Sequence, residues 1–382
     1  VYSGDTNYPG STSAVIVQCV NQAPSISSAN SSTVIVLNTG QSFSVLTTGF
    51  PASTITTGDP LPVGVTLSPA GVLSGTPATG TAGTYVLNLT ASNGVAPDAT
   101  QVFTLTIAKR NQTINFNAQP TAQYGTTFNI NPTATSGLAV TVTASGGCSM
   151  VTATSVHMDS ATVNCVLTAS QAGNADYNAA PNEIETVTAQ RASTTVSVVP
   201  NPSQSSYSYP MTFTVTVTSA GGIPTGTVTL SGGSPNQNIT VPLDALGQAQ
   251  ITTGLPYLIV VFLLGPVPHG TLFTGTNPLN FTYNGDANFN TDSQTTSHTV
   301  YPAPTQVNVT SDVNPSALGQ SVIFTITVST TPPGVGIPPG TVVLYDGLNP
   351  ISGTLTLTNG VATFTTSALT FGAHNISAQY TS

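Results

Sequence analysis

The chain has 382 residues and a net charge of −9, and its three Lys or Arg and twelve Asp or Glu make up 4% of the sequence, against ~25% in an ordinary globular protein. The basic residues are Lys109, Arg110 and Arg191. Nucleic-acid binding needs clustered Lys and Arg to neutralise phosphates, so this composition excludes it. The length suits three to four modules of roughly 100 residues each.

Alternating apolar and polar residues run along the chain, punctuated by Gly, Pro, Asn and Asp. This period-2 pattern predicts half-buried β-strands. Strands spaced about 8–12 residues apart, with turn residues between them, are typical of β-sandwiches. We therefore predict an all-β fold of tandem sandwiches arranged end to end. In chain order, the clearest strand-like segments are 43–50, 84–92, 102–108, 194–199, 211–219 and 321–329.

The stretch 23–108 carries Leu-Pro-x-Gly-Val-Thr-Leu at 61–67 and Leu-Ser-Gly-Thr-Pro at 73–77. On these motifs the whole stretch resembles the putative Ig family of bacterial surface proteins. The next stretch, 112–180, resembles another small bacterial β-repeat module and ends in a Gly-Asn-x-x-Tyr corner. The resemblance implies a β-sandwich for each stretch.

Two later segments, 201–230 and 314–344, repeat each other. They share an Asn-Pro-Ser turn, a Phe-Thr-Val/Ile-Thr-Val strand and a Gly-Ile-Pro-x-Gly-Thr-Val hairpin entry. They resemble bacterial Ig-like repeat domains, whose last hairpin carries a Tyr-x-Gly-Asp-x-Asn-Tyr/Phe motif. That motif occurs at 283–289 and also at 2–8. The chain thus opens with what resembles the end of an Ig-like module.

The other end of the chain reaches Tyr380, the position equivalent to Tyr283 and Tyr2. We expect either that the sequence is one period of a longer tandem chain or that neighbouring subunits complete each other's sandwiches. The expected organisation is a C-terminal hairpin of an Ig-like module at 1–20, a putative-Ig sandwich at 21–108, a small β-repeat module with a disulfide at 109–192, an Ig-like repeat with an apolar insertion at 193–302, and an Ig-like repeat without its last strand at 303–382.

Residues 2–20 are expected to supply the closing hairpin to an Ig-like module of the kind that begins at about Pro304, because an open sandwich invites strand addition. The apolar insertion within 255–280 is too hydrophobic for an exposed loop. We expect it to form either an extra buried strand in its own sandwich or a contact with another module or subunit. The candidate interface residues are Tyr2, Val15, Ile16, Val17, Val261, Phe262, Leu263 and Tyr380.

Three cysteines are present. Cys148 and Cys165 lie 17 residues apart, on either side of a turn within one module, and in a secreted β module this predicts a disulfide worth about 3 kcal/mol through loop closure. A metal site would need three or four converging ligands, and only His157 is nearby in sequence. Cys19 is left over, and we expect either a buried thiol or an intermolecular bridge.

Other chemistry finds no support in the sequence. Each Gly-Asp loop (Gly4-Asp5 and Gly285-Asp286) has too few carboxylates for calcium, which takes six or more oxygens, so turn formation by Asp is favoured. The four histidines are scattered over different modules. Glu183 and Glu185 alternate on one strand face, whereas glycosidase carboxylates face each other across a cleft. We therefore predict no catalytic, cofactor or metal residues and no enzyme activity.

The composition indicates a durable extracellular material whose surface is wetted by Ser, Thr, Asn and Gln; compositional drift without function is the alternative. The longest apolar run, Tyr257–Pro268, is too short to cross a bilayer, so no membrane span is predicted. The leading hypothesis is an extracellular fibre or surface stalk on a bacterial cell, whose partners are copies of itself or adjacent Ig-like modules. The alternatives are an adhesin with a glycan or protein ligand, or a spacer in a larger surface protein.

Overall fold

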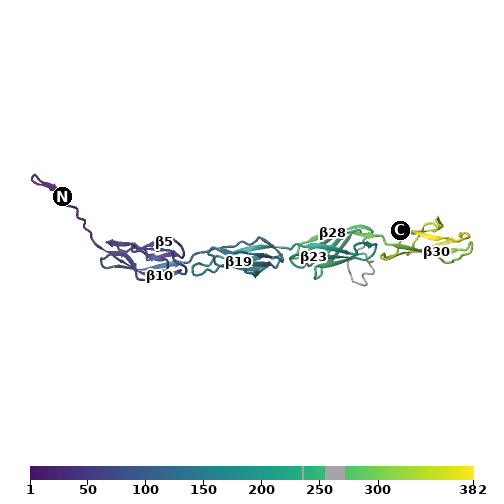
Figure 1. The fold of residues 1–382 in the computed structure, drawn as a ribbon, viewed down its shortest axis with the longest axis horizontal. Helices are drawn as coiled ribbons and strands as arrows, with labels where there is room; N and C mark the ends of the chain where they lie inside the picture. Colours follow the sequence, from purple (N-terminus) through teal and green to yellow (C-terminus); the bar gives the residue numbers. More distant parts are fainter. Residues whose placement is uncertain (235, 254–271) are drawn as a thin grey trace.

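The computed structural model describes residues 1–234, 236–253 and 272–382. Within these ranges the chain is all-β and contains no helix, which confirms the predicted fold class. Four β-sandwiches follow one another along a rod, and a short hairpin lies at the N-terminal end, beyond an extended segment (Figure 1). Four separate hydrophobic clusters of described residues correspond to the four sandwiches.

Sandwich 1 contains strands β3 to β11 and buries the alternate apolar residues of its longest pair. In β10 and β11, Leu87 lies opposite Phe103, and both side chains are fully buried. The sheets are β4-β11-β10-β7, β5-β9-β8 and β3-β6. The bounds are β3 Gln22–Ile26, β4 Ser31–Ile35, β5 Gln41–Ser44, β6 Thr47–Phe50, β7 Thr54–Thr57, β8 Val65–Leu67, β9 Val72–Gly75, β10 Gly83–Ser92 and β11 Ala99–Ala108.

Sandwich 2 contains strands β12 to β20 around a core that includes Val156, Met158 and Leu167. Its sheets are β13-β20-β19-β16, β14-β18-β17 and β12-β15. The bounds are β12 Ile114–Asn115, β13 Thr121–Gln123, β14 Thr127–Asn129, β15 Thr133–Ala134, β16 Thr141–Gly146, β17 Cys148–Thr152, β18 Ser155–Met158, β19 Cys165–Ser170 and β20 Glu183–Gln190.

Sandwich 3 packs the sheet β21-β23-β26 against β22-β28-β27-β24-β25. The alternation in β23 buries Phe213, Val215 and Val217 against Phe281 and Tyr283 of β27. The bounds are β21 Thr195–Asn201, β22 Ser205–Ser206, β23 Met211–Thr218, β24 Thr227–Gly232, β25 Gln237–Pro242, β26 Gln248–Thr253, β27 Gly275–Tyr283 and β28 Asp292–Tyr301. The candidate residues Val261, Phe262 and Leu263 lie outside the described residues.

Sandwich 4 repeats this plan with one difference at the edge of its second sheet. The first sheet is β29-β30-β34, and in the second β31 pairs with β32, β33 and β35. Within the described residues β35 has β31 as its one strand neighbour, whereas the equivalent β27 lies between β24 and β28. The bounds are β29 Thr305–Ser311, β30 Val322–Thr330, β31 Thr341–Asp346, β32 Asn349–Pro350, β33 Leu355–Thr356, β34 Val361–Thr366 and β35 Ile376–Thr381.

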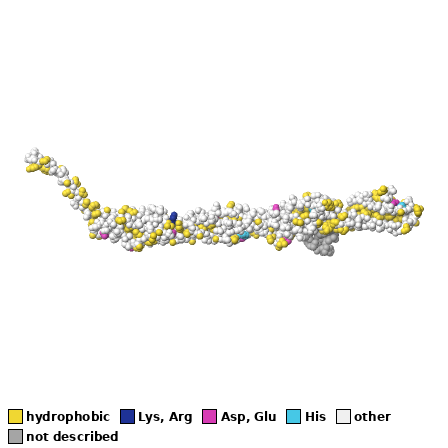
Figure 2. Space-filling model, viewed as in Figure 1, with side chains coloured by type: hydrophobic (Ala, Val, Ile, Leu, Met, Phe, Trp, Pro, Cys, Tyr) yellow, Lys and Arg dark blue, Asp and Glu magenta, His cyan; other side chains and the backbone are white. Residues whose placement is uncertain are grey.

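The N-terminal hairpin consists of β1 Tyr2–Gly4 and β2 Pro9–Ser11. Residues 12–20 after it are outside any strand and exposed. In Figure 2 the visible face of the rod is largely uncharged, and hydrophobic side chains gather along this N-terminal segment and along sandwich 4. These two apolar surfaces lie at opposite ends of the molecule.

Candidate functional site

A tight corner follows β27 and is built by one aspartate. The Oδ1 atom of Asp286 accepts the backbone N–H groups of Asn288 and Phe289, both at 2.8 Å. Gly285 before it has φ 74°, a left-handed conformation that glycine adopts without steric penalty. The Gly-Asp pair therefore forms a turn through side-chain-to-backbone hydrogen bonds, as the sequence predicts.

The same corner recurs twice in the described residues. Asp5 Oδ1 accepts the N–H groups of Asn7 and Tyr8 at 2.8 and 3.0 Å. At the third position an asparagine takes the place of the aspartate, and Asn174 Oδ1 accepts from Asp176 and Tyr177 at 2.8 and 2.9 Å. The shared sequence is Gly-Asx-x-Asx-Tyr/Phe, and we refer to the segments 4–8, 173–177 and 285–289 as corners.

In sandwich 3 the corner is fastened to the hairpin entry at Thr225. The Tyr283 hydroxyl donates to the Thr225 carbonyl at 2.7 Å, and Asp286 Oδ2 accepts the Thr225 hydroxyl at 2.5 Å. Burial raises the pKa of Tyr283 to about 12, with the Asp286 charge adding to the effect. Burial also opposes ionisation of Asp286, but its hydrogen bonds to Thr225, Asn288 and Phe289 outweigh burial and lower its pKa.

Each of the two inner corners holds the linker that precedes its own sandwich. The Ala192 N–H donates to the Asn288 carbonyl at 2.9 Å, and the Asn290 N–H donates back to the Ala192 carbonyl at 3.0 Å. The other corner repeats this pattern: the Arg110 N–H donates to the Asp176 carbonyl at 2.8 Å, and the Asn178 N–H to the Arg110 carbonyl at 2.8 Å. The linkers at 110 and 192 are thereby tied to the corners by main-chain hydrogen bonds.

The same corners also reach the sandwich before them. Asp176 Oδ1 accepts the N–H of Gly80 in sandwich 1 at 2.6 Å. The equivalent atom of Asn288 accepts the N–H of Ala161 in sandwich 2 at 3.4 Å. The second Asx of the motif thus contacts the preceding sandwich at two successive junctions, between sandwiches 1 and 2 and between sandwiches 2 and 3. Sequence reasoning identified the corners as turns but missed this contact, although the recurrence of Asn or Asp at that position was a visible signal.

Side-chain and backbone packing closes the junction between sandwiches 2 and 3. The Tyr124 and Phe289 rings meet edge to face with centroids 5.5 Å apart. The backbones of Gly125 and Gly221 also approach closely, since a Cβ on Gly125 would lie 2.2 Å from the Gly221 carbonyl oxygen. At the junction between sandwiches 1 and 2, Lys109 Nζ donates to the Asn174 carbonyl at 2.7 Å. The first two junctions of the rod are therefore held by specific contacts.

Sandwich 4 has a groove of about 610 Å³ beside its exposed edge. Apolar side chains from β29, β30, β35 and the loop before β35 line it, among them Val309, Val322, Phe324, Leu369 and Ile376. Tyr380 in β35 is partly buried, and its hydroxyl donates to the Pro339 carbonyl at 2.6 Å. Pro339 occupies the position of Thr225 in the shared Gly-Ile-Pro-x-Gly segment, so Tyr380 is the counterpart of Tyr283.

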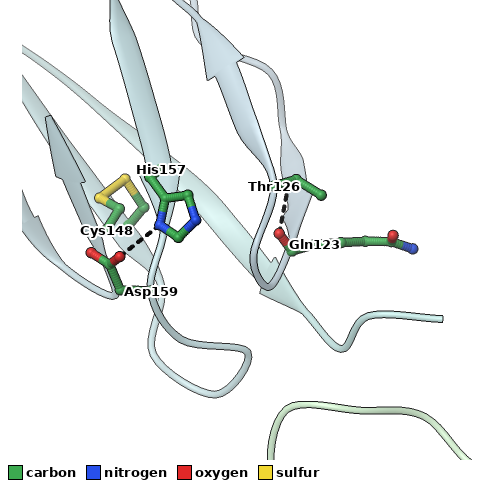
Figure 3. A network of polar contacts seen from close by, with 6 residues as sticks. Gln123, Thr126, Cys148, His157 and Asp159 are labelled. Carbon is green, nitrogen blue, oxygen red and sulfur yellow. Dashed lines mark hydrogen bonds and ion pairs between the residues drawn. A yellow bond between two sulfur atoms is a disulfide. The ribbon is translucent and has the colours of Figure 1, made fainter. Parts of the chain in front are cut away.

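The predicted disulfide joins Cys148 and Cys165 with an S–S distance of 2.00 Å, and Cys19 is free and exposed. The expectation of a buried Cys19 thiol is therefore not met within this chain. Beside the disulfide, His157 points toward Asp159 (Figure 3), with 2.7 Å between Nδ1 and Oδ1. The hydrogen bond from His157 lowers the pKa of Asp159. The described residues hold no group of three or more His, Cys, Asp or Glu placed to bind a metal ion.

Two other histidines have defined environments. His298 is buried in sandwich 3, where its Nε2 lies 3.0 Å from the Ser205 hydroxyl, and burial lowers its pKa. The Nε2 atom of His374 lies 2.8 Å from the Thr370 carbonyl oxygen, and its Nδ1 atom lies 2.5 Å from Oδ2 of Asp346. These contacts raise the pKa of His374.

The structure does not bring the predicted interface residues together within one chain. Tyr2, Val15, Ile16 and Val17 are exposed near the N-terminus, whereas Tyr380 lies in β35 of sandwich 4. The N- and C-terminal parts of the chain lie at opposite ends of the molecule (Figure 1). Their role as an interface remains a prediction. None of the described residues forms a helix long and apolar enough to cross a membrane.

Two family models match the chain. Residues 309–382 match the bacterial Ig-like domain (group 3), and residues 14–108 match the putative Ig domain. The chain therefore carries bacterial Ig-like repeat modules, as the motifs indicate. The resemblances of 112–180 and 193–302 lie outside the matched segments and stay predictions. No curated protein matches the sequence.

Solved structures with tandem domains resemble the chain at low identity. They include a Ca²⁺-stabilised adhesin of an Antarctic bacterium that binds ice (16% identity, 95% of this chain and 99% of that chain, TM-score 0.28). The Escherichia coli adhesin FdeC is 17% identical over 66% of this chain and 87% of its own (TM-score 0.24). Sidekick-1 immunoglobulin domains 1–5 are 10% identical over 94% and 79% (TM-score 0.24).

Proposed function

We propose that this chain, which carries bacterial Ig-like modules at 14–108 and 309–382, is a structural element of the bacterial cell surface, a fibre or stalk that provides reach and durability. The observation that carries the proposal is the recurrence of the corner at successive junctions. In both places one motif holds the linker and bonds to the preceding sandwich. A chain of independent domains has no need of such contacts, whereas a stiff rod depends on them.

The low charge and the disulfide support an extracellular location. Disulfides persist in oxidising compartments, and Cys148–Cys165 is fully formed inside the core of sandwich 2. The proposal includes module boundaries at 21, 109, 193 and 303. It also includes polymerisation, in which the hairpin and strand at 1–20 complete an Ig-like module that has an open edge.

Stiffness is tested by removing one junction contact. In a Cys19→Ser background, spin labels at Val86→Cys and Ile184→Cys, both exposed positions, report the distance between sandwiches 1 and 2. Asp176→Ala removes the bond to Gly80 and should broaden the distance distribution at least twofold. Asp98→Ala is the matched control, because it removes an exposed carboxylate away from the corner. Equal distance distributions for Asp176→Ala and Asp98→Ala would contradict the proposal that the corner stiffens the rod.

The function itself is tested on cells. Antibodies to the folded chain should decorate a continuous filament or stalk in electron micrographs of the bacterial surface. Dispersed surface labelling together with selective binding on a glycan array would support the adhesin alternative and reject the fibre.

A further inference from the structure

The three basic residues of the sequence all lie in linkers between sandwiches. Lys109 and Arg110 follow β11 and precede β12, and Arg191 lies between β20 and β21. All three side chains are exposed. Proteases of trypsin-like specificity cut the peptide bond that follows a Lys or Arg. In this sequence such a protease has three bonds to cut, 109–110, 110–111 and 191–192.

At the first linker, the cleavable bonds are hydrogen-bonded to the corner at 173–177 and to Asn178 directly after it. The Arg110 N–H, which contains the nitrogen that would leave on cleavage of the 109–110 bond, donates to the Asp176 carbonyl at 2.8 Å. The Lys109 carbonyl oxygen accepts the side-chain amide of Asn178 at 3.5 Å. The Arg110 carbonyl oxygen accepts the backbone N–H of Asn178 at 2.8 Å. Both cleavable bonds therefore have their carbonyl oxygen engaged.

The second linker repeats this arrangement with the corner at 285–289. The Ala192 N–H, which contains the leaving nitrogen of the 191–192 bond, donates to the Asn288 carbonyl at 2.9 Å. The Arg191 carbonyl oxygen accepts the side-chain amide of Asn290 at 3.2 Å. Asn290 is the counterpart of Asn178, because each directly follows the aromatic residue of its corner. The 191–192 bond is thus held through the same two atoms as the 109–110 bond.

Each basic side chain also contacts the corner that holds its linker. The three contacts are Lys109 Nζ to the Asn174 carbonyl at 2.7 Å, the Arg110 guanidinium over the Tyr177 ring at 5.9 Å from its centroid, and Arg191 Nε to the Ala287 carbonyl at 3.4 Å. A trypsin-like protease takes the basic side chain into its specificity pocket and the carbonyl oxygen into its oxyanion hole. Both groups are already bound by the corner, so the linker must leave the corner before it can be cut.

We propose that the two linkers are latent processing sites for a trypsin-like protease, closed while the corner holds the linker and open once it is released. Hydrolysis breaks the C–N bond with one water, whose hydroxyl joins the carbonyl carbon and whose proton goes to the departing nitrogen. The cuts fall between β11 and β12 and between β20 and β21, so the products are whole sandwiches. Sandwich 2 keeps both cysteines of its disulfide. This inference goes beyond the proposed fibre and does not depend on it.

Limited digestion of the full chain with trypsin tests whether the linkers are closed. Synthetic peptides covering 104–116 and 186–197 serve as open references, and mass spectrometry of the fragments measures the rate at each bond. Cutting of a folded protein follows the population of the opened segment, and each hydrogen bond that must break contributes a factor of about five. We therefore expect the bonds of the native chain to be cut about a hundredfold more slowly than the same bonds in the peptides. Equal rates would overturn the proposal.

A reciprocal pair of variants tests whether the corners close the linkers. Asn178→Ala removes the side-chain bond to the Lys109 carbonyl and should speed cutting at 109–110 about fivefold, with 191–192 unchanged. Asn290→Ala removes the equivalent bond to the Arg191 carbonyl and should do the reverse. Each variant is the matched control of the other. Unchanged rates at both linkers, or equal acceleration of both by either variant, would overturn the proposal.

A second protease separates release of the linker from unfolding of the sandwich. Chymotrypsin cuts after aromatic residues, and Phe128 is buried in the core of sandwich 2. Cutting after Phe128 should stay at the native rate in Asn178→Ala while cutting at 109–110 rises. A parallel rise at Phe128 would attribute the trypsin result to unfolding and overturn the role of the corner.

Discussion

Asp5 and Asp286 form the same type of local turn at two places in the chain, but their surroundings differ. Asp5 and Asp286 each accept two backbone N–H groups from the following residues. For Asp5 the hydrogen bonds from Asn7 and Tyr8 lower the pKa. Asp286 accepts in addition the N–H and hydroxyl of Thr225, which fastens the corner to the hairpin entry of sandwich 3. The local sequence determines the turn, and packing determines what the turn contributes.

Replacing these aspartates should therefore have unequal effects. Asp286→Ala leaves the N–H groups of Asn288 and Phe289 without their acceptor and should lower the unfolding free energy of sandwich 3 by about 3 kcal/mol. Asp5→Ala removes the same turn where it contacts no core and should leave all four sandwiches unchanged. Denaturant titration followed by hydrogen exchange of β27 and β28 measures both. A loss of similar size in the two variants would contradict the assignment.

The pKa values of His374 and His298 should be shifted in opposite directions from the ordinary value of histidine. The hydrogen bonds of His374 to Thr370 and Asp346 raise its pKa above the ordinary 6.5, whereas burial lowers that of His298. The stability contributed by His374 is therefore fully present below pH 6.5 and is lost as pH rises through its folded pKa. The stability of sandwich 3 instead falls as pH drops below 6.5 toward the lower pKa of His298. NMR titration of each imidazole checks the order, and His374→Gln should remove the loss above pH 6.5 from sandwich 4.

Removing the disulfide should weaken sandwich 2 alone. The double variant Cys148→Ala/Cys165→Ala should lower its unfolding free energy by about 3 kcal/mol, because the denatured chain regains the freedom of a closed loop. In the native oxidised protein a thiol reagent should modify only Cys19, which is exposed. Modification of three thiols in the native protein would show that the bridge is absent.

At the scale of elements, the second sheets of sandwiches 3 and 4 differ by one strand position. β27 has hydrogen-bonded neighbours on both sides, whereas β35 has β31 as its one described neighbour. At the junction between sandwiches 2 and 3, the loop at Gly125 approaches the loop at Gly221 closely, backbone against backbone.

Alanine substitutions at Gly125 and Gly137 distinguish the effect of backbone strain from the effect of losing the junction contact. Gly125 and Gly137 have φ values of 73° and 77°, so alanine costs each about 1–2 kcal/mol of left-handed strain. Only at Gly125 would the new Cβ meet the Gly221 carbonyl oxygen, while nothing lies within 4 Å at Gly137. Gly125→Ala should therefore also widen the angular distribution between sandwiches 2 and 3, as measured by spin-label distances. An equal effect of Gly137→Ala would contradict the contact.

At the scale of the whole molecule, the rod has few charged side chains. The chain has fifteen charged residues of the Asp, Glu, Lys and Arg types in 382, and the visible face in Figure 2 is mainly uncharged. The junction contacts are hydrogen bonds, ring packing and backbone approach, which salt screens little compared with exposed ion pairs.

The length of the rod should therefore be insensitive to salt. The maximum dimension of the chain, measured by small-angle scattering, should agree within about 5% between roughly 0.05 and 1 M NaCl, because screening acts on exposed charges. Its matched comparison is the Asp176→Ala variant, whose curve should indicate greater flexibility at every salt concentration. A length that shortens steeply with salt would show that charge repulsion holds the molecule extended.

The sequence by itself determined the all-β fold, the disulfide and the turn at each Gly-Asx pair. These depend on local patterns: period-2 alternation, two cysteines across a turn, and a side chain that bonds two residues ahead. Only the tertiary structure showed that Asp176 and Asn288 reach a neighbouring sandwich and that Phe324 and Ile376 line a groove. Those contacts join residues about 50 to 130 apart, and no local pattern encodes which distant backbone will meet a given side chain.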